Sequence, residues 1–333
     1  MTKPHREKSL LLITSLLVAA AFIISTFMGQ FPLSVNDIFT IITGGEISDI
    51  RRNVFFTLRL PRVTMALIAG AGLGMTGCVL QLVFKNPLAS PGIIGVSSGA
   101  NLGAAAAIVM FGYHARFIMP SAFLGGMLVV FAVIALARMT KINDTVVYVL
   151  AGIIMRSVSE AFIMMFKFYA DPERQLASIE FWSMGSLANV TDTKVLAVLP
   201  AFLIGFFGLA LLWRQIMMLN LNEEESQALG MRVGLIRTVV LALVALTVSA
   251  IVSVTGLISF IGLIAPHIAK LAYKRVNFTW CMLSALFGAF IMLAADSAAR
   301  TMHTSEIPIS ILTTFIGVPF LLWFMYKGRL LRS

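Results

Sequence analysis

Charged residues are scarce in this sequence. Asp, Glu, Lys and Arg make up 12% of its 333 residues, whereas a water-soluble globular domain carries about 25%. Apolar residues make up 59% of the chain, and they gather in uncharged runs of about 20 residues, the length that crosses a bilayer. The scarcity of charge excludes a soluble globular protein and predicts one all-α, polytopic membrane domain over residues 1–333.

Sites for covalent chemistry are also missing from the sequence. The two cysteines, Cys78 and Cys281, stand alone in apolar runs, and the four histidines are scattered, so neither shows metal-ligand spacing. The sequence contains no GxxxxGK[ST] motif and therefore no Walker A phosphate loop. No arrangement of a nucleophile with its base is visible. We expect no catalytic residue, no metal and no cofactor bound by this chain.

The charge-poor runs predict ten membrane-spanning helices. The run 238–269 is 32 residues long, more than one crossing needs, and Gly256, Gly262 and Pro266 can divide it into two. Basic residues precede the first run and follow the last, so the positive-inside rule places both termini in the cytoplasm and requires an even number of spans. The other runs lie near residues 9–28, 63–84, 93–112, 117–137, 145–166, 195–213, 277–295 and 307–326.

The basic residues punctuate the apolar runs. The formal net charge is +10, but a nucleic-acid binder would cluster its Lys and Arg on one soluble face. Contact with membrane lipid explains them better, and we expect no nucleic-acid partner. Arg51, Arg52, Arg59 and Arg62 fall on the predicted external side, against the positive-inside bias, so they call for a separate explanation.

One polar island, residues 219–232, lies between two apolar runs on the predicted cytoplasmic side. It contains an N-cap residue, a glutamate three positions later as in a capping box, acidic residues that complement the helix dipole, and a glycine suited to the C′ position. This pattern predicts a two-turn helix over 223–229 with an apolar edge. A solvated connector is the alternative. The residues concerned are Asn222, Glu223, Glu224, Glu225, Ala228, Leu229 and Gly230.

Four further stretches, together with this island, resemble the permeases of iron-siderophore, haem and vitamin B12 ABC importers. The stretches are RLPRVTMALIAGAGLGMTG (59–77), NPLASPGIIGVSSGA (86–100), GLISFIGLIAPHIAKL (256–271) and ADSAARTMHTSEIPISILTTFIGVPF (295–320). The resemblance implies the type II ABC importer permease architecture in the bacterial cytoplasmic (inner) membrane. It also implies three kinds of partner: a second permease subunit, identical or paralogous, two cytoplasmic ATPase subunits that use the ATP, and an extracellular substrate-binding protein.

The resemblance further implies roles for particular residues. The island would be the coupling helix that inserts into the ATPase. Arg59, Arg62 and Arg300 would receive acidic residues of the binding protein, although an arginine at a span end can also snorkel to lipid headgroups. The residues that would form the cytoplasmic gate are Asn86, Leu88, Asp144 and Thr145.

Arg156 and Glu160 are four residues apart in the fifth predicted span. Ionisable residues inside a span are costly and suggest a pathway, whereas this spacing also permits an intrahelical ion pair. Both can hold together. Asp296 and Glu306 bracket Arg300, which predicts a local ion-pair network there.

The sequence therefore predicts the permease subunit of a binding-protein-dependent ABC importer. A ferric siderophore is the favoured cargo because it is the commonest in the resembled group, with haem and vitamin B12 as alternatives. The rival of another class is an ion-gradient-driven secondary transporter with Arg156, Glu160 and Asp296 as its relay. Inverted repeats would favour that rival, and none is visible.

Overall fold

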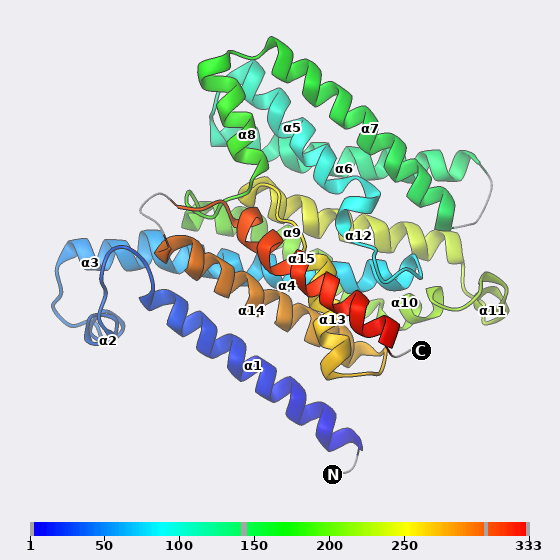
Figure 1. Ribbon diagram of the computed structural model, residues 1–333, viewed down its shortest axis with the longest axis horizontal. Helices are drawn as coiled ribbons and strands as arrows, with labels where there is room; N and C mark the ends of the chain where they lie inside the picture. The colour runs from blue at the N-terminus through cyan, green and yellow to red at the C-terminus, as the bar shows by residue number, and fades with distance from the viewer. Residues whose placement is uncertain (1–2, 141–144, 303–305, 331–333) are drawn as a thin grey trace.

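The computed structural model describes residues 3–140, 145–302 and 306–330, and these residues form helices joined by loops (Figure 1). The helices are α1 (Lys3–Phe27), α2 (Val35–Thr43), α3 (Asp49–Asn53), α4 (Leu60–Val83), α5 (Val96–Phe111), α6 (Ala115–Met139), α7 (Thr145–Tyr169), α8 (Ala177–Ser183), α9 (Asp192–Leu211), α10 (Trp213–Leu219), α11 (Glu223–Ala228), α12 (Val233–Thr255), α13 (Ile261–Ala272), α14 (Phe278–Thr301) and α15 (Ile309–Leu330).

Each of the ten predicted spans corresponds to one apolar helix. Of the described helices, seven are long and apolar enough to cross a membrane, and α4 does so as part of a continuous helical rod over 49–83. The other three, α5, α13 and the described part of α15, are apolar but shorter. The polytopic all-α fold is thus confirmed.

The long apolar run divides at residues 256–260. Gly256, which ends α12, has φ +67°, and Phe260, which directly precedes α13, has φ +66°, a range that residues other than glycine rarely adopt. The predicted break at Gly256 is therefore correct, but Gly262 and Pro266 lie inside α13. Gly262 does not interrupt the helix; its missing side chain lets α13 lie against the backbone of α4 at Leu73.

Helix α4 is the central element of the fold. It packs against α14, α13, α12 and α9, and most of its residues are buried. Gly70 and Gly74 face the backbone of α14, and Gly77 faces the carbonyl of Gly262 in α13. Small residues let membrane helices approach closely, so these glycines set the distances between α4 and its neighbours α13 and α14.

Replacement of Gly77 by alanine should prevent correct assembly. A Cβ at this position would overlap the Gly262 carbonyl oxygen, which is backbone and cannot rotate away. Overpacking of this kind costs about 1–3 kcal/mol or more, and we expect a low yield and a lowered melting temperature in detergent. Gly234→Ala is the matched control, because a Cβ there meets nothing within 4 Å; equal melting temperatures of the two variants would contradict the packing role.

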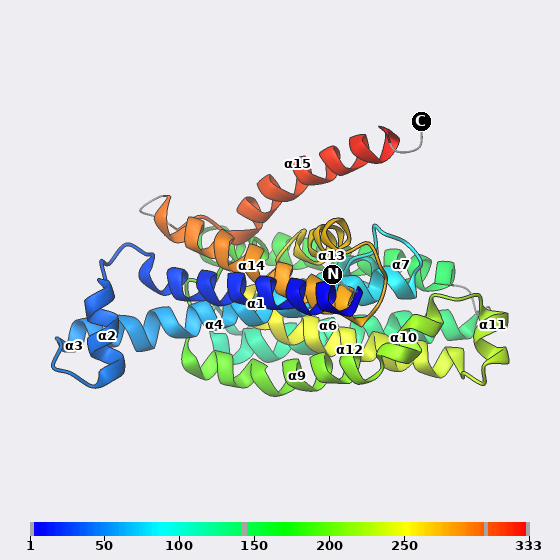
Figure 2. The same cartoon turned by 90° about the horizontal axis from the view of Figure 1, so that it is seen from below.

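The bundle has two distinct ends. Helices α2 and α3 lie at one end, and α10 and α11 lie at the other (Figures 1 and 2). Helix α1 begins and α15 ends toward the end that carries α11 (Figure 2). A small satellite core of Leu33, Ile38, Ile41 and Phe55 holds the α2 end together. The island, the start of α1 and the end of α15 thus lie toward one end of the bundle.

Candidate functional site

The polar island forms the short helix α11, as its capping residues predict. The backbone N–H of Asn222 donates to the carboxylate of Glu225 over 3.3 Å, which is one half of the capping box. Gly230 has φ +81° and donates its N–H to the carbonyl of Gln227, while Met231 donates to Ser226. These last two bonds make a Schellman motif. The helix ends at Ala228, one residue before the predicted end, with Leu229 as its C-cap.

Helix α11 presents an apolar edge to its surroundings. Ser226 is buried and its hydroxyl donates to the carbonyl of Met218 over 2.7 Å, which holds α11 to α10. Ala228 is exposed, and Leu229 is 64% exposed. Leu229 therefore leaves an apolar side chain exposed at the tip of the capped helix.

Glu223 has a partner that the sequence analysis missed. Its carboxylate accepts a hydrogen bond of 2.6 Å from Arg237, an α12 residue whose side chain is 3% exposed. The guanidinium of Arg237 also lies over the ring of Tyr148 in α7, 5.5 Å from its centroid. Arg237 thus joins α11, α12 and α7. The one feature of the sequence that singles out Arg237 is its position directly before the uncharged run 238–269.

Loss of the Glu223 charge should loosen this junction. Glu223→Gln replaces a charge-assisted hydrogen bond to a buried guanidinium, and such bonds contribute about 1.5–3 kcal/mol. We expect a lower melting temperature for this variant in detergent. The control is Glu224→Gln, since Glu224 is exposed and surface changes usually stay within about 0.5 kcal/mol. If the two variants have the same melting temperature, Glu223 does not anchor α11.

Arg59 and Arg300 bind the C-terminal end of α1. Arg59 donates from Nη1 to the carbonyls of Thr26 and Phe27, at 2.8 and 2.7 Å. Arg300 donates to the carbonyl of Met28 over 3.0 Å and to Ser25. The last carbonyls of a helix lack intrahelical partners, so both arginines satisfy groups that would otherwise be unpaired.

Arg62 is the centre of a buried ion-pair network. Its Nε lies 2.8 Å from Asp296 Oδ1 and its Nη1 lies 2.7 Å from Glu306 Oε1. The other oxygen of Asp296, whose side chain is fully buried, lies 3.0 Å from Arg300. The predicted network around Arg300 is confirmed, but Glu306 binds Arg62 and not Arg300.

These contacts show that the three arginines are buried and have partners within the chain. Arg59, Arg62 and Arg300 are 5%, 6% and 6% exposed, and each binds groups within the chain. The spacing of arginines in a sequence does not reveal which carbonyls or carboxylates the fold brings to them. Their docking role stays a prediction, and in this conformation it would require them to exchange internal partners for those of a binding protein.

Two of the predicted gate residues lie in the turn after α4. The backbone N–H of Leu88 donates to Asn86 Oδ1 over 2.9 Å, and the side chain of Leu88 is 59% exposed. Thr145 begins α7, whereas Asp144 lies outside the described residues. The gate assignment therefore stays a prediction.

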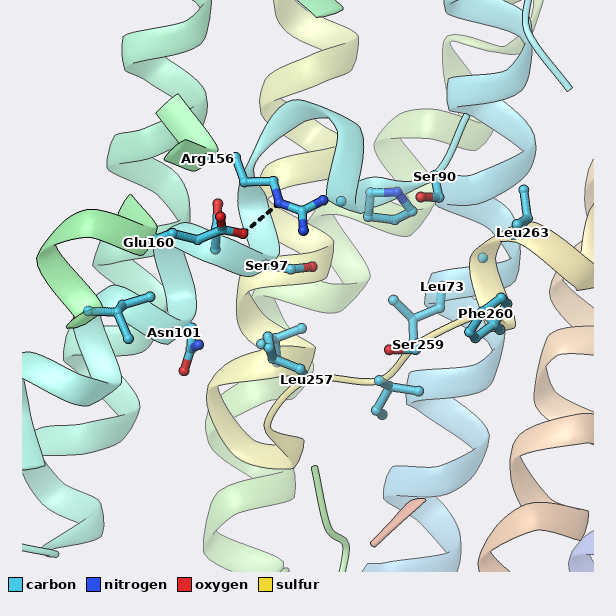
Figure 3. Close-up of a pocket in the computed structure, with 17 residues that line it drawn as sticks. Leu73, Ser90, Ser97, Asn101, Arg156, Glu160, Leu257, Ser259, Phe260 and Leu263 are labelled. Atoms are coloured by element: carbon cyan, nitrogen blue, oxygen red, sulfur yellow. Dashed lines mark hydrogen bonds and ion pairs between the residues drawn. The ribbon is translucent and has the colours of Figure 1, made fainter. Parts of the chain in front are cut away.

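Arg156 and Glu160 line a cavity of about 460 Å³ (Figure 3). They form an ion pair of 2.7 Å, and their side chains are 62% and 46% exposed. The opposite walls come from the turn after α4 and from the connection between α12 and α13. The intrahelical ion pair that the spacing permits is present, and both residues also line this cavity. Their place in a transport pathway stays a prediction. The hydroxyl and amide groups of the lining belong to Ser90, Ser97, Ser98, Asn101 and Ser259.

Comparisons with known proteins agree on the family and the fold of this chain. The model of the FecCD transport family matches residues 16–327. The molybdate import system permease of Haemophilus influenzae is 36% identical over 98% of this chain and 97% of its own length. The hemin transport system permease of Yersinia pestis is 32% identical over 93% and 92%. A solved inward-facing metal-chelate type ABC transporter covers 96% of this chain and 99% of its own, with a TM-score of 0.86 and 34% identity.

Proposed function

Because the chain belongs to the FecCD transport family and is the permease subunit of an ABC importer, we propose that its cargo is a ferric siderophore. The observation that carries the proposal is the polar cavity beside Arg156, which offers a chelate both hydrogen-bond donors and a cation. Iron chelate permeases of Helicobacter pylori are 35% identical over 83% of this chain, which supports this cargo. Molybdate is the second candidate because of the relative in Haemophilus influenzae.

The proposed mechanism uses the two ends of the bundle differently. The end with α11 faces the cytoplasm. There each of two permease subunits inserts the exposed tip of its α11 into a cleft on one of two ATPase subunits. The end with α2 and α3 faces a binding protein that delivers the cargo. Two permease subunits enclose the pathway, and ATP-driven closure of the ATPases moves α11 and alternates access between the two sides of the membrane. This chain supplies the conduit and the coupling surface, and the partner hydrolyses ATP.

The positions of Arg156, Glu160 and Asp296 do not favour the alternative of an ion-gradient-driven secondary transporter. A relay needs its ionisable groups within reach of one another along one pathway. Asp296 is instead fully buried between Arg62 and Arg300, and it does not line the cavity that holds Arg156 and Glu160.

The cargo can be identified through the binding protein. We expect a binding protein that co-purifies with the assembled transporter to bind ferric siderophores in a calorimetric titration. A titration series should also contain molybdate, haem and cyanocobalamin. Tight binding of molybdate with no response to siderophores would replace the proposed cargo by the second candidate, and binding of haem or cobalamin alone would contradict both.

A further inference from the structure

The ion pair of α7 is unusually exposed for a membrane-spanning helix. Arg156 and Glu160 lie midway along α7 and keep 62% and 46% of their side-chain surface. A charge at this depth is costly unless it faces water, a partner or a ligand. Since both residues line the cavity, their free surface is directed at whatever occupies that cavity.

The cavity presents donors to an occupant. Arg156 uses only its Nε to bind Glu160, and its terminal nitrogens point away from Glu160 into the cavity in Figure 3. Ser97 lies below this guanidinium, and Ser90 lies across from it (Figure 3). Hydroxyl groups and a guanidinium together suit carboxylate and oxyanion oxygens, which accept two parallel hydrogen bonds from arginine.

Glu160 limits how strongly an anion can bind. Its carboxylate, 2.7 Å from Arg156 Nε, offsets part of the positive charge and holds the guanidinium in place. Passage through a conduit requires a contact favourable enough for entry and weak enough for release. An uncompensated arginine would retain an anion, whereas an apolar wall would not attract one.

We propose that this cavity is a transient anion site, in which Arg156 contacts the oxygen atoms of an anionic cargo and Glu160 keeps the contact weak. The cargo class is an anion with clustered oxygens, supplied either by a compact oxyanion or by the carboxylates of a metal chelate. This inference rests on the proposed function, since it concerns the cargo within the pathway.

The sign of the cavity's potential can be measured without transport. Ser97→Cys places a thiol in the cavity, and the native Cys78 and Cys281 are fully buried. The assembled permease with its ATPase subunits is labelled with an anionic and a cationic methanethiosulfonate, and the ratio of the two rates is recorded. We expect Arg156→Gln to lower the anion-to-cation ratio and Glu160→Gln to raise it, each by about tenfold, because a unit charge a few Å away in water changes each rate by about threefold in opposite directions.

Protection against labelling then identifies the anion. Molybdate alone should slow the labelling if the site takes an oxyanion, and ferric citrate alone should slow it if the site takes a carboxylate chelate. In either case the protection should be lost in Arg156→Gln. Lys167→Gln is the control, because Lys167 forms a similar pair of 2.6 Å with Glu180 outside the cavity lining.

Three results would overturn the anion site. They are a ratio that neither variant shifts, a ratio that Lys167→Gln shifts equally, and protection by neither anion. Because labelling needs no ATP hydrolysis and no binding protein, these results leave the importer function standing. Loss of ATP-driven uptake with the expected labelling ratios would instead contradict the proposed function and not the site.

Discussion

Transport should fall to background when residues 223–229 are deleted, while the membrane bundle stays folded. The deletion removes α11 and its exposed tip at Leu229, which we propose as the surface that the ATPase grips. The ATPase subunits should then hydrolyse ATP without moving cargo, or fail to assemble. Uptake into proteoliposomes and ATP hydrolysis in the same preparation measure the two activities.

Point variants separate the shape of α11 from its presence. Gly230→Ala forces an alanine into φ +81°, which costs about 1–2 kcal/mol, and Glu225→Ala removes the capping-box partner of Asn222. We expect both to lower the uptake per ATP hydrolysed. Gly234→Ala, four residues beyond and free of contacts within 4 Å, should leave that ratio unchanged. Full uptake by the deletion variant would show that α11 is only a connector.

Neutralising Asp296 should destabilise the α2 end of the bundle more than any other single charge change among the described residues. Asp296 is fully buried and binds two arginines that are themselves 6% exposed. Asp296→Asn keeps the size of the side chain but leaves those guanidinium groups with less compensation, and breaking a buried pair costs about 3–5 kcal/mol. Thermal unfolding in detergent measures the loss as a lowered melting temperature.

An ion pair at the same end, in which the arginine is exposed, provides the control. Arg51 pairs with Asp37, and its side chain is 46% exposed, so Arg51→Ala should change stability by about 1 kcal/mol or less. An equal fall in melting temperature for the two variants would contradict the structural role of the Asp296 network.

The pKa of Asp37 is held below its usual value, mainly by the backbone N–H of Ser34 and also by Arg51.

The sequence predicted those features that depend on neighbours along the chain. Helix α11 followed from Asn222, Glu225 and Gly230, because capping chemistry is local. The pairing of Arg156 with Glu160 followed from their spacing on one helix. The number of apolar helices followed from the number of apolar runs, and the run 238–269 was divided correctly because parity required an even number of crossings.

Contacts between distant segments could not be predicted in this way. Arg62 binds Asp296 and Glu306, more than 230 residues away, and no local pattern indicates such a partner. The same holds for Arg237 with Tyr148 and for the hydroxyl groups that join Arg156 around the cavity. The burial of Arg59 and Arg300 against the carbonyls at the end of α1 could not be predicted for the same reason.

ATP-driven uptake by the reconstituted transporter tests the central claim most directly. The permease is placed in proteoliposomes with its ATPase subunits and loaded binding protein, and cargo accumulation is followed with and without internal ATP. A permease of this kind should accumulate cargo only when the ATPase, ATP and the binding protein are all present. Accumulation that persists without the ATPase and instead follows an imposed ion gradient would contradict the account.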